Sequence, residues 1–284
     1  MRIKPQIQYL SNSTCVRFQF PVNIKREEMK VKVDGFSGGD RVHTKLPKSQ
    51  TDLLKKLKAT GKPIVLVLLN GSALSINWEN DNIPAIIQAW YPGQAGGTAI
   101  ADVIFGDYNP AGRLPVTFYK DINDIPPFSD YKMKGKTYRY FEGTPLYEFG
   151  YGLSFTDFEY SNLTVSEEVK AGEDLEVKVD IKNIGKMDGE EVAQVYLKNP
   201  DAGALNPKIS LSSFERVFLK AGEQKTVTFT VSKDQMSMVN DNGEKVVNPG
   251  ALNLYVGGSQ PSKSSKKGSV VTKTVKVVGN VTKV

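Results

Sequence analysis

The sequence has one cysteine, Cys15, and one histidine, His43, among 284 residues. A single cysteine excludes an internal disulfide, and with only one histidine beside it there is no set of zinc ligands. The single histidine has no nucleophile-elbow context, so a Ser-His-acid triad is not indicated. We therefore expect no metal, no cofactor, and neither cysteine nor histidine chemistry, and we interpret His43 as a solvated loop residue.

Two further absences concern the membrane and the cell compartment. No apolar run approaches the roughly 20 residues that cross a bilayer. Residues 1–21 lack the continuous apolar stretch and the small-residue cleavage site of a signal peptide. The residues therefore predict no membrane span, and they do not predict a localisation.

Clusters of one charge sign are also scarce. The 37 Lys and Arg residues exceed the 31 Asp and Glu residues by six, but they alternate with acidic residues, as in Asp174 to Asp180. Only residues 262–267 are locally basic, and we interpret them as a flexible loop. This distribution argues against nucleic-acid binding, which needs basic residues gathered with stacking aromatics.

The first part of the chain alternates between helix and buried-strand signals. Residues 64–69 are six consecutive apolar residues, the pattern of a strand covered on both faces. The preceding segment, 49–60, has one apolar face and then Gly61, which marks a helix end. This alternation predicts an α/β layered fold. Further along we expect a strand over 85–90, a glycine-rich turn over 92–97, a helix over 98–105 and a strand over 114–118.

The pattern changes from Phe158 onward to short, often alternating apolar segments separated by turn residues. About seven strands at this spacing predict an all-β sandwich of immunoglobulin-like architecture. At 284 residues, two domains are expected in any case. The predicted strands are 163–165, 175–181, 192–197, 217–219, 227–231, 252–256 and 270–278.

Between the two parts, Tyr138 to Phe155 places seven aromatic rings among glycines and a proline. The spacing is too irregular for one helix face and too interrupted for one strand. Each such ring removes on the order of 150–250 Å² from water when it is buried. We therefore expect this segment to be a strap that packs its rings against two folded bodies and joins them.

Two segments could carry chemistry. The glycine-rich loop at 92–97 lacks both the G-x-G-x-x-G spacing and the Walker lysine, so we interpret it as a tight turn and not as a phosphate site. The acidic, glycine-rich stretch from Glu27 and Glu28 to Asp40 and Arg41 could hold a general acid on a loop of the α/β scaffold. A solvated surface loop is the commoner explanation of such a glutamate pair.

Several motifs closely resemble family 3 glycoside hydrolases. They are EEMKV at 27–31, GFSGGDR at 35–41, TGKPIVLVLLNG at 60–71, WYPGQAGGTAIADVIFGDYNPAGRLPVTF at 90–118, and the aromatic strap. The resemblance implies an α/β layered sandwich followed by an immunoglobulin or fibronectin III-like β-sandwich. It divides the chain into an unassigned segment 1–26, a partial α/β sandwich domain 27–125, the strap 126–157 and the β-sandwich 158–284.

The resemblance also implies an activity: hydrolysis of β-linked glycosides with retention, as in β-glucosidases and β-xylosidases. Matching by position puts the family's acid/base on Glu27, with Glu28 as the fallback. Asp40 and Arg41 are candidate substrate-binding residues, and the alternatives are that they orient the loop through a charge-assisted pair or are simply exposed. Residues 24–26 depart from the Leu-Glu-Gly that usually precedes the matched glutamate. A periplasmic or secreted location is implied by the family alone.

In the family an N-terminal barrel supplies the nucleophilic aspartate, and a barrel needs about 250 residues. We therefore expect this chain to correspond to a C-terminal portion that is inactive without the barrel. A non-catalytic module for carbohydrate binding or protein association is the alternative, and the face left by the barrel could promote self-association. Trp78, Trp90, Tyr91 and the strap rings could stack on sugars, although packing is the favoured interpretation.

Overall fold

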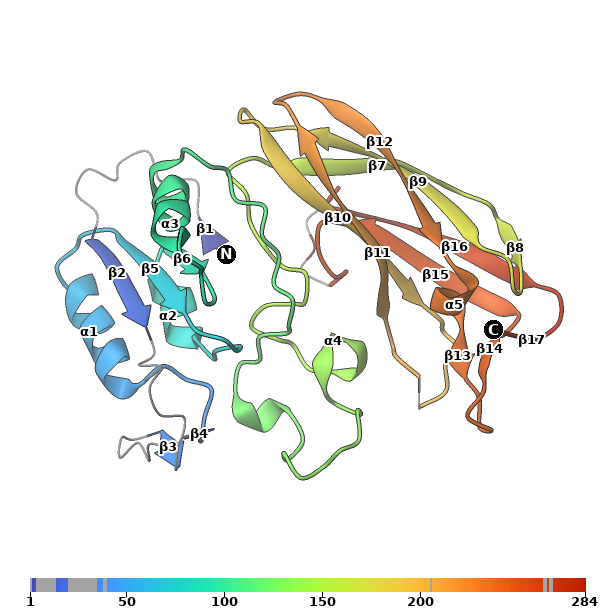
Figure 1. Cartoon of the computed structure of the whole chain (residues 1–284), viewed down its shortest axis with the longest axis horizontal. Helices are drawn as coiled ribbons and strands as arrows, with labels where there is room; N and C mark the ends of the chain where they lie inside the picture. The colour runs from blue at the N-terminus through green and yellow to red at the C-terminus, as the bar shows by residue number, and fades with distance from the viewer. Residues whose placement is uncertain are drawn as a thin grey trace.

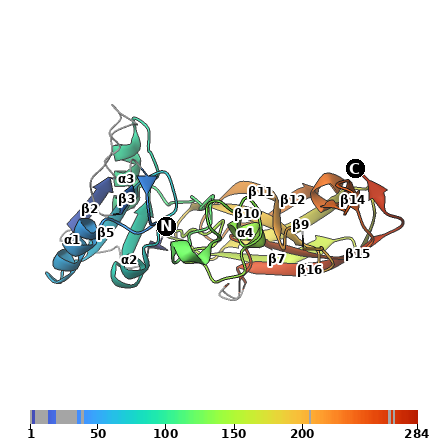
Figure 2. The same cartoon turned by 90° about the horizontal axis from the view of Figure 1, so that it is seen from below.

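The computed structural model describes residues 2–3, 14–19, 35–37, 40–204, 206–262, 265 and 268–284. Two bodies lie side by side, an α/β layer and a β-sandwich, with the green strap between them (Figure 1). The view from below shows the same elongated arrangement (Figure 2). This architecture confirms the predicted fold class.

The α/β body is built on the sheet β1-β6-β5-β2. Its central strand β5 (Ile64–Leu69) is buried along its whole length, as six consecutive apolar residues predict. It pairs in parallel with β2 (Thr14–Gln19) and with β6 (Ala85–Gln88). β1 (Arg2–Ile3) adds an antiparallel edge next to β6. Strands β1 and β2 come from residues 1–26, to which the sequence assigned no domain.

Helices cover both faces of this sheet. On one face α1 (Lys48–Lys58) buries Leu54 in a cluster with Leu66 and Leu68. On the other face α3 (Gly96–Phe105) packs Ile100 and neighbouring residues against Val65 and Val67. α1 is followed by Gly61 at φ 75° and α3 by Gly106 at φ 87°, which confirms glycine as the stop signal of both helices.

The α/β body differs from the sequence prediction in two places. The strand expected over 114–118 is wrong, because this stretch is an extended loop with one isolated bridge between Phe118 and Tyr147. Pro115 lacks the N–H that a continuous ladder needs. A short helix α2 (Asn77–Asn82) was not predicted, since its six residues carry almost no apolar periodicity.

The second body is a β-sandwich of two main sheets, and all seven predicted strands are present. Along β9 the residues Leu175, Val177, Val179 and Ile181 are buried and alternate with outward-facing positions. The sheets are β11 (Ser210–Leu219), β10 (Gly189–Lys198), β15 (Gly250–Gly257), β16 (Val270–Val278) and β8 (Glu168–Lys170), and β12 (Gln224–Val231), β9 (Leu175–Asn183) and β7 (Phe158–Val165).

Short elements complete the chain. They are the hairpin β3 (Phe36–Ser37) with β4 (Asp40–Arg41), the 3-10 turn η2 (Ile122–Asp124), α4 (Thr137–Tyr140), α5 (Lys233–Met236), and the small sheet β13 (Met238–Val239), β14 (Lys245–Val247) and β17 (Thr282–Lys283). None of the helices in the described ranges is long and apolar enough to span a bilayer.

The strap divides its aromatic rings between the two bodies. All seven rings are buried or half-buried, as the sequence predicted. The ring of Tyr147 stacks on that of Tyr151, with the ring centroids 5.1 Å apart. It also makes a tilted contact with the ring of Phe118 of the α/β body, at a centroid distance of 5.9 Å. Tyr138 stacks on Phe149 at 4.1 Å and meets Tyr196 of the sandwich edge-on. The strap therefore contributes rings to the core of the α/β body and packs other rings against the sandwich.

A buried ion pair crosses between the two bodies. Arg113, from the loop after α3, lies 2.6 Å from Glu191 of β10, and their side chains are 10% and 3% exposed. Tyr160 donates a hydrogen bond of 2.8 Å to the second carboxylate oxygen. Burial raises the pKa of Glu191, while Arg113 and Tyr160 limit the rise. The Nε of Arg113 also donates to the Gly258 carbonyl at 3.1 Å.

We predict that this pair is strongly coupled in stability. Arg113→Met or Glu191→Gln alone should lower the free energy of unfolding by about 3–5 kcal/mol, because each leaves a buried charge without its partner. The double variant should lose less than the sum, by about 1–3 kcal/mol, in urea unfolding.

The exposed pair Lys170 and Glu173, 3.8 Å apart, serves as the matched control. Its cycle should show no measurable coupling, as is common for exposed ion pairs. Strict additivity at Arg113 and Glu191 would contradict the role assigned to the buried pair.

Candidate functional site

The candidate site lies at one edge of the α/β sheet. Strands β2, β5 and β6 run in parallel, so their carboxyl ends meet at the same edge. In open α/β sheets ligands bind in the crevice outside these ends. The described backbone reaches this edge at Gln19, at Asn70 after β5 and at Ala89 after β6. The segments that follow these strands therefore form the candidate site.

The structure describes only two of the four predicted site residues, Asp40 and Arg41. Glu27 and Glu28 lie outside the described residues, so their roles stay predictions. The backbone of Asp40 pairs with Ser37 in the β3–β4 hairpin. Arg41, its neighbour, has a described side chain, and this side chain reaches the segment that follows β5.

Arg41 connects the hairpin to the edge of the sheet. Its guanidinium donates a hydrogen bond to the hydroxyl of Ser72. Burial lowers the pKa of Arg41, and nearby Tyr91 acts in the opposite direction. Arg41 remains a cation at neutral pH, because an arginine pKa lies far above 7. The arrangement presents a partly buried positive charge near the carboxyl ends of the strands.

The buried amide of Asn70 and the half-buried amide of Gln88 hold the segment that accepts Arg41. Asn70, 3% exposed, donates to the carbonyl of Ser72 and accepts a hydrogen bond of 3.0 Å from Gln88 of β6. The amides therefore tie the ends of two neighbouring strands together. The sequence analysis missed Asn70, Ser72 and Gln88. The sequence signal that could have identified them is their position: each is a polar residue at or just after the end of a buried strand.

The aromatic residues near this edge divide into packed and exposed rings. Trp90 packs edge-on against Phe118 at 6.2 Å, and Lys55 lies over the ring of Trp78 at 5.5 Å. Both tryptophans contact the core cluster, in agreement with the packing interpretation. Tyr91, in contrast, is 63% exposed. Trp90 has φ 54°, which is unusual for a bulky residue and is a feature that gathers at functional sites.

His43 is not the solvated loop residue that was expected. It is half-buried, and its ring lies so close to Gly35 that a Cβ there would come within 2.6 Å of Nε2. Gly35 has φ 91°, so both its conformation and the adjacent ring require glycine. The ring thus packs against the start of the hairpin that carries Arg41.

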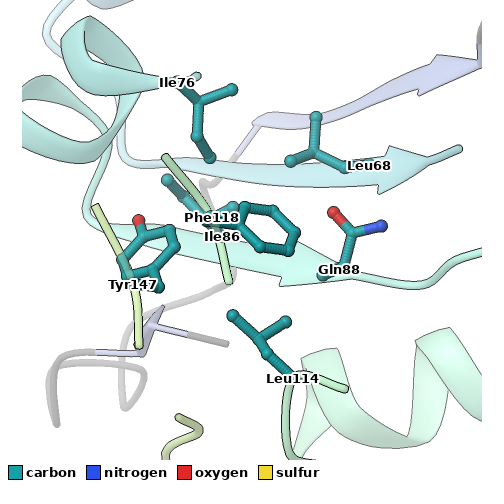
Figure 3. Close-up of a pocket in the computed structure, with 7 residues that line it drawn as sticks. All are labelled: Leu68, Ile76, Ile86, Gln88, Leu114, Phe118 and Tyr147. Carbon is teal, nitrogen blue, oxygen red and sulfur yellow. The ribbon is translucent and has the colours of Figure 1, made fainter. Parts of the chain in front are cut away.

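A small cavity lies behind the edge, between the sheet and the strap (Figure 3). It measures about 10 Å³, roughly one water-sized sphere, so it cannot hold a sugar. Gln88 points its amide into this space, and its carbonyl oxygen has no hydrogen-bond partner within the described residues. The other lining residues are Leu68, Ile76, Ile86, Leu114, Phe118 and Tyr147. The cavity is a packing feature of the core and not a substrate site.

The pKa shifts of the described carboxylates point to no general acid at the edge of the sheet. A general acid needs a raised pKa. Where a described carboxylate has a displaced pKa, the displacement is downward, except for Glu191 in the contact between the two bodies. Over the same residues, no group of three or more His, Cys, Asp or Glu side chains could hold a metal ion.

Comparisons with known proteins agree on both parts of the chain. The profile of the glycosyl hydrolase family 3 C-terminal domain matches residues 13–155, and that of a fibronectin type III-like domain matches residues 191–260. A xylan 1,4-beta-xylosidase of Xylanibacter ruminicola is 43% identical over 249 residues, which are 86% of this chain and 28% of the relative. A periplasmic beta-glucosidase of Salmonella typhimurium is 38% identical and covers 82% of this chain and 33% of its own.

The crystal structure of a beta-glucosidase from Listeria innocua superimposes with a TM-score of 0.75 at 32% identity. The match covers 94% of this chain and 36% of that protein. The chain therefore spans about a third of the length of the relatives it matches.

We predict that Asn70 stabilises the edge of the sheet. Asn70→Ala should lower the free energy of unfolding by about 1–3 kcal/mol, because it removes a buried amide and leaves the part-buried N–H of Gln88 without its acceptor. Asn123→Ala, at an exposed position of η2, should change it by less than about 0.5 kcal/mol. Equal effects of the two substitutions in urea unfolding would show that the amide pair contributes nothing.

Proposed function

The chain belongs to glycosyl hydrolase family 3, and from that premise we propose that residues 1–284 supply the acid/base side of a retaining β-glucosidase- or β-xylosidase-type site. The observation that supports this is the family match over residues 13–155. Two relatives with these printed activities are 43% and 38% identical to the chain over aligned stretches of 249 and 252 residues. The proposed ligand is a β-linked oligosaccharide or glycoside.

The proposed chemistry needs two carboxylates about 5–5.5 Å apart. Glu27 protonates the glycosidic oxygen as the bond breaks, and it later takes a proton from the attacking water. Glu28 is the fallback for this role. Asp40 and Arg41 bind substrate beside it, where the guanidinium of Arg41 can donate hydrogen bonds to sugar hydroxyls.

The topology supports this placement. β2 ends at Gln19, eight residues before Glu27 in the sequence, and the described chain resumes with the hairpin that carries Arg41. The last described residue before Glu27 and the first described hairpin after it therefore both lie at the edge near Ser72, which supports the proposal for Glu27. Loops on a rigid sheet are the usual carriers of catalytic groups.

The nucleophile is proposed to come from elsewhere. The resemblance places it on a barrel, and the chain spans about a third of its relatives. Residues 1–284 by themselves then lack the covalent step of the mechanism. We also keep the division at residues 26, 125 and 157 as a proposal.

We expect residues 1–284, purified alone, to show no turnover of aryl β-glucosides or aryl β-xylosides. The reason is that acid/base assistance contributes only about 10²–10⁴-fold, and the nucleophile is missing. Release of the chromogenic phenol is the measurement. Turnover that Glu27→Gln abolishes would contradict the proposal.

The role of Glu27 can be tested in a chimera. Residues of this chain replace the matching segment of the Xylanibacter ruminicola xylosidase. In the chimera, Glu27→Gln should lower kcat by about 10²–10⁴-fold for a xyloside with a poor leaving group. The loss should be much smaller with a good leaving group, which needs little protonation.

Glu28→Gln is the matched control in the same chimera and should cost less. If Glu28→Gln carries the larger, leaving-group-dependent loss, the assignment to Glu27 is wrong. If the unsubstituted chimera is inactive although it folds, these residues do not supply the acid/base side.

A non-catalytic binding module remains the second candidate. It is favoured by the strap's loop at residues 126–136, which exposes the rings of Phe128 and Tyr131. Self-association through the face left by the barrel is a third proposal, and concentration-dependent sedimentation of residues 1–284 tests it.

A further inference from the structure

The strap carries a closed loop at residues 126–136, far along the chain from the sheet-edge residues. Its ends meet, because a Cβ on Gly135 would lie 3.2 Å from the ring of Pro126, and Gly135 has φ 75°. Asp130 holds the tip: its side chain accepts from the Lys132 amide at 2.9 Å, and its own amide donates to the Pro127 carbonyl at 2.9 Å. Lys136 donates from its side chain to the Asp130 carbonyl. The loop is fixed by its own hydrogen bonds.

This fixed loop presents two aromatic rings to solvent. Phe128 is 94% exposed and Tyr131 is 86% exposed, whereas the seven rings of the following segment are all buried or half-buried. Neither ring belongs to a hydrophobic cluster of the described residues. Exposed rings held on an ordered loop indicate a surface that binds something.

A polar pocket of about 310 Å³ adjoins the loop through Lys134 and Gly135. This volume lies at the lower end of the range for ligand sites. Its side chains combine two cations, two carboxylates, a hydroxyl and one ring: Lys120, Lys134, Asp124, Glu142, Thr144 and Phe141. Phe141 is held edge-on by Tyr119 at 4.9 Å.

The charges in the pocket favour a neutral ligand with many hydroxyls. Glu142 pairs with Lys208 of the sandwich, and hydrogen bonding to Lys208 lowers the pKa of Glu142, so its carboxylate is ionised. Asp124 accepts a hydrogen bond of 3.0 Å from the Asp121 amide. Two carboxylates repel an anion, while the ammonium groups beside them repel a cation. Donors and acceptors together suit sugar hydroxyls, and the rings suit the apolar face of a pyranose.

We propose that the loop 126–136 and this pocket form a second saccharide-binding surface, separate from the sheet edge. Phe128 and Tyr131 stack on the sugar rings of a β-linked chain, and Lys134, Glu142 and Thr144 bind its hydroxyls. The choice of β-linked glucose or xylose units rests on the proposed function. The surface itself rests on the exposed rings and the pocket.

The test is isothermal titration of residues 1–284 with xylohexaose and with cellohexaose. Tyr131→Ala, Phe128→Ala and Lys134→Ala should each weaken binding about three- to tenfold, and the double aromatic variant should weaken it more than about tenfold. These side chains are exposed, so the variants should fold as the parent does, which thermal unfolding checks.

Phe105→Ala is the matched control, because Phe105 is 72% exposed at the end of α3 and belongs neither to the loop nor to the lining of the pocket. It should leave the affinity unchanged. The test uses binding and not turnover, so failure of the chimera experiment would not alter its result.

Three results would overturn the proposal. The first is an absence of binding at millimolar oligosaccharide. The second is binding that the loop variants leave unchanged or that Glu27→Gln abolishes, which would place the sugar elsewhere. The third is sedimentation that changes in Phe128→Ala or Tyr131→Ala without any sugar binding, which would make the loop a contact between protein chains.

Discussion

The ion pair between Arg113 and Glu191 is the constraint on which the arrangement of the two bodies depends. It is almost completely removed from water, so each charge needs the other, and both need their additional hydrogen bonds. Such a pair permits little sliding, because any shift that breaks it leaves a buried charge unpaired. The contact between the bodies therefore has a defined register as well as apolar area.

The strap adds apolar contacts to this polar one. Tyr147 and Tyr151 contribute to the core of the α/β body, while Tyr138 and Phe149 pack toward Tyr196 of the sandwich. Gln194 lies beneath, donating to the carbonyls of Gly258 and Gly150. A Cβ on Gly150 would come within 2.2 Å of the Gln194 side chain, so the glycine lets the strap approach the sandwich. Together these contacts join the α/β body to the sandwich.

This rigidity bears on function because it fixes two separate surfaces on one frame. The edge of the sheet gathers Arg41, Ser72 and the buried amide of Asn70 from segments that are distant in the sequence. The strap presents its exposed rings on a loop closed by its own hydrogen bonds. A site of each kind gains from a scaffold that does not have to be ordered when a ligand binds.

Local patterns in the sequence specify the classes of structure in this chain. The continuous apolar run of β5, the alternation along β9 and the glycines after α1 and α3 each reflect local rules of burial and backbone conformation, which need no knowledge of distant residues. Which residues of different elements contact one another, in contrast, is visible only in the tertiary structure. The bridge of Phe118 to Tyr147, the pairing of Arg113 with Glu191, and the approach of Arg41 to Ser72 join residues 29 to 78 positions apart. No local pattern specifies such contacts, because they depend on how separate elements pack against one another.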